Sequence, residues 1–219
     1  MSEKRVHILA IERGSLPMLG DGFHQLDLAA THDPMHLWFG PRPRLEQDEA
    51  WRQIIPYVVC RYQGRLVRYT RAPSGGEDRL HGKQSIGLGG HIDLADAVVT
   101  NGAIDLTKTV RQAANRELAE EIGQVFDVTE NTPARTFAGI IIDDSNAVGR
   151  VHVGLVALVE ISRLEADAIE HHLENVELVS PAQIAADIDR LENWSRILVP
   201  HLAALAAAAS PVDHNGPET

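Results

Sequence analysis

The sequence is poor in the residues that mark several classes of protein. It has a single cysteine, Cys60, so it can form no internal disulfide and offers no cysteine pair of the kind that binds zinc. Its 20 basic side chains are outnumbered by 31 acidic ones, which argues against a surface that grips the nucleic-acid backbone. No apolar run is long enough for a membrane span or a signal peptide. These absences predict a cytoplasmic protein that binds neither nucleic acid nor membrane.

What is present suits a globular protein with a substantial core. Apolar residues make up 44% of the 219 residues, and this length fits one large domain or one domain with extensions. We expect a strand- and loop-rich extension over 1–50, packed on a main domain over 51–209, and a disordered tail over 210–219. The net charge of −11 does not exclude phosphate substrates, because bound cations can invert the local field.

Runs of β-branched and aromatic residues between turn residues predict strands, and 3.6-residue apolar periodicity predicts helices. The expected strands are 5–13, 57–62, 65–71, a glycine-rich strand end at 85–93, and two long strands around "DDSNAVG". The expected helices are a short one near 46–54, one that starts near 106–109 and ends at Gly123, a weak one over 162–174, and two over 180–192 and 193–209; loops fill the rest of 14–50 and 94–105. This order predicts an α/β (α+β) fold in which helices sandwich a mixed β-sheet.

The stretch "NRELAEEIGQ" concentrates acids where a helix tolerates them least. Glu117, Glu120 and Glu121 lie within about 100° of arc on a helical wheel, and like charges at this spacing repel one another. Gly123 indicates the C-cap of the helix. Glu120 and Glu121 therefore fall in the last turn, where the helix dipole disfavours anions. A solvated surface helix is the alternative, because glutamate is a good helix former. The clustering favours a divalent cation.

The same stretch resembles the core of the Nudix box, whose pattern is G-x5-E-x7-R-E-U-x-E-E-x-G-U, with U a bulky apolar residue. "RELAEEIG" fills six of its specified positions, and the neighbouring elements, over roughly 50–203, follow the Nudix order. A strict count puts Gly102 at the box glycine and Lys108 at the upstream glutamate, which has a supporting role in the family. If Gly90 of "SIGLGGHID" is the box glycine instead, about a dozen residues are added and that glutamate has no clear counterpart. "IIPYVV", "YTR" and "EDRLHGKQSIGLGGHI" also resemble a bacterial Nudix subgroup that carries only a general phosphoesterase label.

The resemblance implies a Nudix-like α/β/α sandwich with a loop-helix-loop catalytic motif, and hydrolysis of a nucleoside diphosphate linked to another group, with Mg²⁺ or Mn²⁺. Hard carboxylate oxygens suit Mg²⁺. The implied metal ligands are Glu117, Glu120, Glu121 and the carbonyl of Gly90. Arg116 would orient the glutamates, and Glu120 or Glu121 could act as general base, with Glu174 and Glu177 as alternatives.

Three further residues are candidates for substrate binding. Arg71 and Arg79 could contact substrate phosphate, although arginine is more often a surface ion-pair partner. His91, directly after the glycine pair, could reach a phosphate or be a hydrogen-bonded structural histidine.

Two functions remain open from the sequence. The first is a metal-dependent pyrophosphohydrolase acting on a small nucleotide or other diphosphate. The second is a catalytically degenerate Nudix-like binding or regulatory module, which Lys108 favours and the retained glutamates oppose. A homodimer is compatible with either function.

Overall fold

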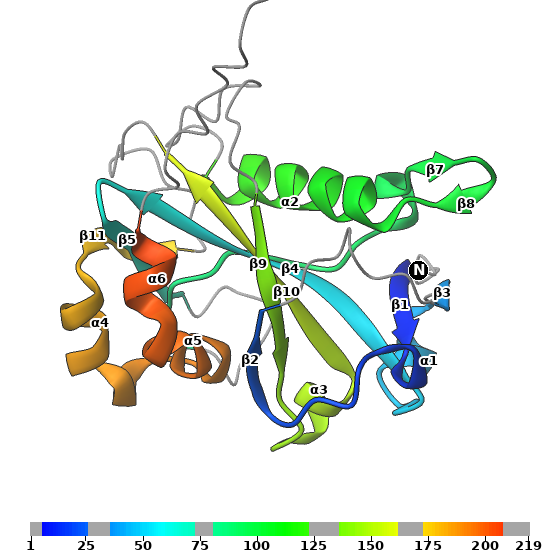
Figure 1. Ribbon diagram of the computed structural model, residues 1–219, viewed down its shortest axis with the longest axis horizontal. Helices are drawn as coiled ribbons and strands as arrows, with labels where there is room; N and C mark the ends of the chain where they lie inside the picture. Colours follow the sequence, from blue (N-terminus) through cyan, green and yellow to red (C-terminus); the bar gives the residue numbers. More distant parts are fainter. Residues whose placement is uncertain (1–5, 26–35, 73–80, 123–135, 162–172, 208–219) are drawn as a thin grey trace, which may run out of the picture.

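The computed structural model describes residues 6–25, 36–72, 81–122, 136–161 and 173–207, and Figure 1 shows their arrangement. The main sheet has nine described strands: β1 (His7–Glu12), β2 (Gly22–His24), β3 (Leu37–Pro41), β4 (Trp51–Tyr62), β5 (Arg65–Arg71), β6 (Gln84–Ser85), β9 (Thr136–Ile142), β10 (His152–Glu160) and β11 (Leu173–Val179). The strands β7 (Val99–Thr100) and β8 (Ala103–Ile104) form a separate hairpin, and the helices are α1 (Arg42–Leu45), α2 (Leu106–Ile122), α3 (Ala147–Arg150), α4 (Pro181–Ala186), α5 (Asn193–Leu198) and α6 (Leu202–Ala206).

The sheet is mixed, as the sequence predicted. Its main path runs β11-β5-β4-β10-β9-β2, with β4 and β10 parallel and the other pairings antiparallel. The long strand β4 changes partner along its length. Its first residues pair with β1, as in Ala10 opposite Gln53, and its last residues pair with β5, as in Arg61 opposite Leu66.

The glycine-rich segment 86–93 lies between these two partners of β4. Leu88 exchanges backbone hydrogen bonds of 2.9 and 2.7 Å with Val58, and the N–H of Leu9 donates to the carbonyl of Ile92 at 2.9 Å. Because the segment enters the sheet between β1 and β5, its glycines come to lie against the middle of β4.

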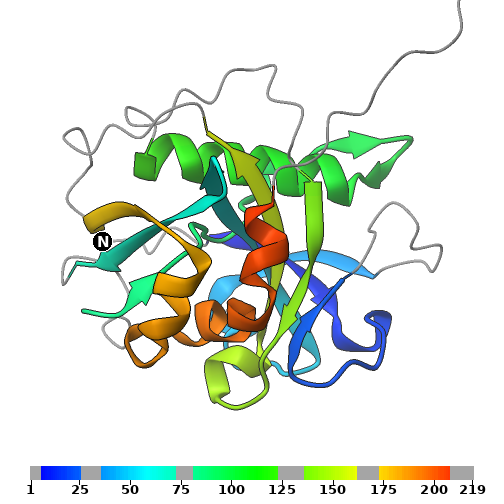
Figure 2. The same ribbon diagram turned by 60° about the vertical axis from the view of Figure 1, so that its left-hand side comes forward.

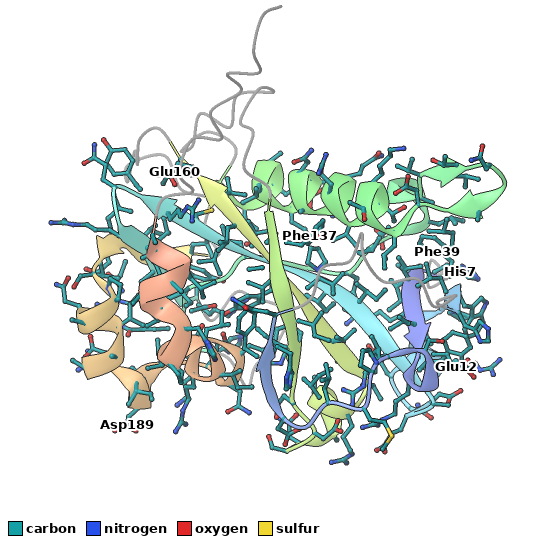
Figure 3. All side chains as sticks on the ribbon, in the orientation of Figure 1. His7, Glu12, Phe39, Phe137, Glu160 and Asp189 are labelled. Atoms are coloured by element: carbon teal, nitrogen blue, oxygen red, sulfur yellow. The ribbon has the colours of Figure 1, made fainter. Side chains whose placement is uncertain are left out.

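Helices cover both faces of the sheet, which confirms the predicted sandwich (Figures 1 and 2). On one face, α2 buries an apolar row against the strands: Val110, Ala113, Ala114 and Leu118. Phe137 of β9 touches both apolar clusters under this helix (Figure 3). On the other face, α4, α5 and α6 bury Ile184, Leu198, Leu202 and Leu205. No helix in the described ranges is both long and apolar enough to cross a membrane.

Three local predictions were wrong. The region 14–50, expected to be loop apart from one short helix, also contains the strands β2 and β3 and the helix α1. The helix expected near 46–54 is absent, because the short helix α1 ends earlier, at Leu45, and β4 begins at Trp51. The β-rich run of β4 decides this, since its side chains are needed in the sheet. The loop expected over 94–105 contains a 3-10 turn at Leu94–Asp96 and the hairpin β7–β8. Asn101 and Gly102 have φ of 53° and 79°, as a tight Asn-Gly hairpin turn requires.

Other expectations fall outside the described residues. They are Gly123 and Arg79, the tail over 210–219, and most of the weak helix over 162–174, whose last two residues instead begin β11. The helices expected over 180–192 and 193–209 are present but interrupted: α4 is followed by a 3-10 turn at Ile188–Arg190, and a 3-10 turn at Val199–His201 separates α5 from α6. The predicted Ser180 cap of α4 is confirmed, since its hydroxyl accepts a hydrogen bond from the N–H of Gln183.

Candidate active site

Arg116 on α2 organises the acidic residues around it. Its Nε and Nη2 donate to the two carboxylate oxygens of Asp96 at 3.1 and 2.8 Å, and Nη2 also donates to the carbonyl of His91 at 2.9 Å. Its Nη1 donates to Glu117 at 2.7 Å and to Glu120 at 3.2 Å. The hydrogen bonds to Asp96, which is 2% exposed, raise the pKa of the Arg116 guanidinium. Arg116 is therefore a fixed cation that holds two of the three glutamates predicted as metal ligands.

Glu117 lies directly against the glycine-rich segment. A Cβ added at Gly90 would come within 2.5 Å of the Glu117 carboxylate, so only glycine leaves room for this side chain. Glu117 is 8% exposed, and its burial raises the pKa of the carboxyl group despite the neighbouring Arg116. No such contact exists at Gly102, whose added Cβ would meet no atom within 4 Å. The structure thus places Gly90, and not Gly102, beside the acidic helix.

Glu121 occupies a different environment at the end of α2. Its Oε2 is buried and has no hydrogen-bond partner in the described part of the chain. Burial, reinforced by repulsion from Glu117 and Glu120, raises the pKa of Glu121 to about 7, although Arg71 acts in the opposite direction. Arg71 has a buried Nε that likewise lacks a partner among the described residues, and its guanidinium lies 5.6 Å from the centre of the Tyr69 ring. Two opposite charges thus lie near each other with unused hydrogen-bonding capacity.

The carboxylates of Glu117, Glu120 and Glu121 suit a hard divalent cation, because they offer oxygen ligands and negative charge. All are oxygen donors, they repel one another, and one buried oxygen is unpartnered. They do not form a finished shell, since within the described ranges no group of three or more His, Cys, Asp or Glu side chains is arranged to hold a metal ion. Glu117 and Glu120 are held by Arg116, whereas the arginine whose charge lowers the pKa of Glu121 is Arg71.

Comparison with known proteins identifies the family of the chain and its fold. No family model matches the chain. Over 157 residues it is 33% identical to Protein YmaB of Bacillus subtilis (strain 168), a match that covers 70% of this chain and 72% of that protein, so the two share a family. The crystal structure of Tm1382, described as a candidate Nudix hydrolase, matches 91% of this chain and 99% of its own, with a TM-score of 0.70 and 23% identity. The fold is therefore that of Tm1382. In the present chain, the residues that match the Nudix box, from Arg116 to Glu121, lie on α2.

The chain therefore belongs to the same family as Protein YmaB, and its fold is a Nudix fold. A Nudix hydrolase from Nitrosomonas europaea is also similar over 70% of this chain and 88% of its own, at 14% identity and a TM-score of 0.47, which is too distant to add to the assignment.

Asp96 is a site residue that the sequence analysis missed. It stands six positions after Gly90, which is the spacing of glycine and glutamate in the box, and it binds the box arginine through both oxygens. Nineteen residues, 97–115, separate it from Arg116, where the box has seven. The hairpin β7–β8 lies in this insertion. The sequence does contain a signal for this residue, namely a carboxylate six positions after Gly90. It was missed because aspartate stands where the box has glutamate, and because the insertion lengthens the spacing to Arg116.

His91 does not face the carboxylates of the Nudix box. Its Nε2 is 2.9 Å from Oε1 of Gln53, and its ring centre is 5.7 Å from that of His152. Burial, together with the charges of Arg42 and His152, lowers the pKa of His91 to about 3, so the ring is neutral at physiological pH. Its backbone carbonyl, which accepts from Arg116, is the part of His91 that contacts the acidic site. Its binding of substrate stays a prediction.

The two alternative bases lie across the sheet from α2. Along β5, Val67 and Tyr69 face the cluster under α2, so Arg68 and Thr70 face the other side. The strand β11 pairs Glu177 with Arg68 and Glu174 with Thr70, which places both glutamates on that other side. Glu177 also accepts from Arg68 at 2.7 Å. The geometry therefore favours Glu120 and Glu121 over Glu174 and Glu177 as sources of a general base.

Proposed function

We propose that the chain is a metal-dependent Nudix pyrophosphohydrolase that cleaves a phosphoric anhydride bond in a nucleoside-diphosphate-type substrate, with Mg²⁺ or Mn²⁺ as its cofactor. The observation that carries the proposal is the set of three glutamates at the end of α2, two of which, Glu117 and Glu120, are anchored by Arg116 and through it by Asp96. Gly90 lies against the Glu117 carboxylate. A structural role does not account for this set, because the acids repel one another at the end of the helix that disfavours them.

The residues of the chain have separate roles in this proposal. Glu117, Glu120, Glu121 and the carbonyl of Gly90 would hold the cation. Arg116 fixes the directions of Glu117 and Glu120, and Asp96 fixes Arg116. When bound, Mg²⁺ would shield the diphosphate charge and make an attacking water more acidic.

Arg71 and the general base complete the assignment. Arg71 has an unpartnered Nε near Glu121, which is consistent with binding a phosphate oxygen there. Glu120, whose side chain is 59% exposed, and Glu121, which has an unpartnered oxygen, are the two carboxylates free to accept a proton from water.

The feature that favoured a degenerate binding module has a different explanation. Lys108 lies in the first turn of α2, where its Nζ is 2.9 Å from Asp105 and 3.4 Å from the hydroxyl of Thr100. It therefore anchors the inserted hairpin, while Asp96 occupies the place of the upstream glutamate beside Arg116. The substitution at position 108 then carries no argument against catalysis.

A panel of substrates tests the proposal. It comprises nucleotide sugars, ADP-ribose, dinucleoside polyphosphates, NADH, coenzyme A and nucleoside triphosphates, each assayed with Mg²⁺, Mn²⁺ or a chelator. We expect one class to be hydrolysed only in the presence of metal, and Glu120→Gln to abolish that turnover while Glu177→Gln retains it. Metal-independent turnover, or equal turnover by the two variants, would contradict the proposal.

A further inference from the structure

A buried polar network lies on the face of the sheet opposite α2. Its members are Tyr57 of β4, Ser85 of β6, and Glu192 and Ser195 at the start of α5; none is more than 9% exposed. The Tyr57 hydroxyl lies 2.7 Å from Oε1 of Glu192, to which it donates, and 2.7 Å from the hydroxyl of Ser195. The Ser195 hydroxyl in turn lies 2.5 Å from the same carboxylate oxygen. Glu192 also accepts from the backbone N–H groups of Trp194 and Ser195.

The network is attached to the beginning of the glycine-rich segment. The Ser85 hydroxyl donates to the carbonyl of Gly87 at 3.0 Å, and the N–H of Ile86 donates to the Ser195 hydroxyl at 3.1 Å. The Tyr57 ring also packs on Gly87 so closely that an added Cβ would come within 2.1 Å of it. From the α2 face, the Tyr69 hydroxyl donates to the same Gly87 carbonyl at 2.6 Å. Gly87 is thus fixed from both sides of the sheet.

Two constrained residues, Leu88 and Gly89, link the fixed position of Gly87 to Gly90. Leu88 is paired with Val58 of β4 in both directions, and Gly89 lies against the carbonyl of Pro56, which an added Cβ would approach to 1.9 Å. Gly90 then meets the carboxylate of Glu117. Because a buried, fully bonded polar network has few alternative arrangements, its geometry determines where this segment runs.

We propose that Tyr57, Ser85, Glu192 and Ser195 are positioning residues for the metal site, which they serve by fixing the segment that carries Gly90. The inference rests on the proposed function, since it assumes that Gly90 and Glu117 together bind the cation. None of the four residues touches the carboxylates of α2. Their effect on the site passes through the backbone of residues 86–90, so loss of a network hydroxyl weakens cation binding without removing any ligand.

Two variants remove single hydroxyls from the network. Tyr57→Phe keeps the ring on Gly87 but loses its hydrogen bonds to Glu192 and Ser195, and Ser195→Ala loses the contact to Ile86. Ser180→Ala is the matched control, because it also removes a hydroxyl from the helical layer, at the cap of α4, but has no contact with the glycine-rich segment. Thermal unfolding of all three shows that they are folded and how far each is destabilised.

Mn²⁺ binding, followed by electron paramagnetic resonance, and amide hydrogen exchange in the metal-free protein are the two readouts. We expect Tyr57→Phe and Ser195→Ala to weaken Mn²⁺ binding by about tenfold, the scale of outer-shell substitutions at metal sites. We also expect faster exchange at Gly87, Gly89 and Gly90, whereas Ser180→Ala lowers the melting temperature and changes neither readout.

The contrary outcomes separate this inference from the proposed function. If the two network variants lose thermal stability but keep the Mn²⁺ affinity and glycine exchange rates of the wild type, the network is merely structural and the inference is wrong. If the wild-type protein itself binds Mn²⁺ no better than Glu120→Gln, the metal site is wrong and the inference fails with it.

Discussion

Two glutamates of this protein, the buried Glu192 and the half-buried Glu121, lie in opposite environments. Glu192 precedes α5 and accepts hydrogen bonds from backbone N–H groups and from the hydroxyls of Tyr57 and Ser195. Glu121 lies in the last turn of α2, beside two other acids, with one buried oxygen unpartnered and its pKa raised to about 7 by burial. The first carboxylate stabilises the fold, whereas the second destabilises it when it is charged.

Substitutions at Glu121 and Glu192 should differ most in their effect on catalysis. We expect Glu121→Gln to lower metal-dependent turnover by about 10²-fold or more, because it removes both a ligand and a candidate base. Glu120→Gln should behave similarly. The measurement is kcat on whichever substrate class the panel identifies. Glu160→Gln is the control that should retain wild-type turnover, because Glu160 alternates with Val159 and Ile161 of the cluster under α2 and so faces the other side of the sheet, where it accepts from Arg61.

Removing the anchor of Arg116 should have the largest effect on stability. Asp96→Asn leaves the guanidinium without its main partner, and breaking a buried ion pair costs about 3–5 kcal/mol, at the lower end here because Arg116 is 29% exposed. Urea unfolding measures the loss. Asp105→Asn breaks the exposed pair with Lys108 and should cost less than about 1 kcal/mol. Equal losses would show that Asp96 is no anchor.

Replacing Glu121 and Glu192 by glutamine should change the free energy of unfolding in opposite directions. A carboxyl whose pKa is raised on folding favours the folded state below the unfolded value of about 4.5, and this contribution is lost as pH rises through about 7. Without metal at pH 8, Glu121→Gln should therefore raise the free energy of unfolding by roughly 1–3 kcal/mol, a gain that shrinks toward zero near pH 5. Glu192→Gln should lower it by about 1–3 kcal/mol, because donors lose a charged acceptor. Urea unfolding at both pH values tests the signs.

Gly90→Ala should affect metal binding more than stability. The added methyl group would displace the Glu117 carboxylate, which is the flexible end of its side chain, so the free energy of unfolding should change by less than about 1 kcal/mol. We expect Mn²⁺ affinity to fall by about tenfold. Gly14→Ala has open space around the new methyl group and serves as the control.

The smallest effect is expected at Lys108. Because its side chain contacts only Asp105 and Thr100 among the described residues, Lys108→Ala should cost less than about 0.5 kcal/mol and leave metal-dependent turnover unchanged. A large loss of turnover in Lys108→Ala would show that Lys108 contributes to the active site.

The sequence predicts the parts of this molecule that local pattern determines. The apolar row of α2, the hairpin of β4 and β5, and the fixed spacing from Arg116 to Glu121 are all local, and all appear in the structure. What could not be predicted depends on pairing across long distances. Asp96 and Arg116 are twenty residues apart around an inserted hairpin, and only the folded chain brings them together.

The polar network is hidden from the sequence for a similar reason. Tyr57 and Glu192 are 135 residues apart, and each is unremarkable in its own neighbourhood. The short helix predicted near 46–54 failed because its β-rich residues were required by the sheet, a tertiary demand that local helix propensity does not contain.

Thermal unfolding of the wild type and of Glu121→Gln at pH 8, in a chelator and in saturating Mn²⁺, tests most directly the claim that the end of α2 is built for a cation. We expect the variant to melt at the higher temperature in chelator and the wild type to melt at the higher temperature in Mn²⁺, because only the wild type retains all three carboxylates. A wild-type protein that melts at the same temperature with and without Mn²⁺, or that remains below the variant in both conditions, would contradict the claim.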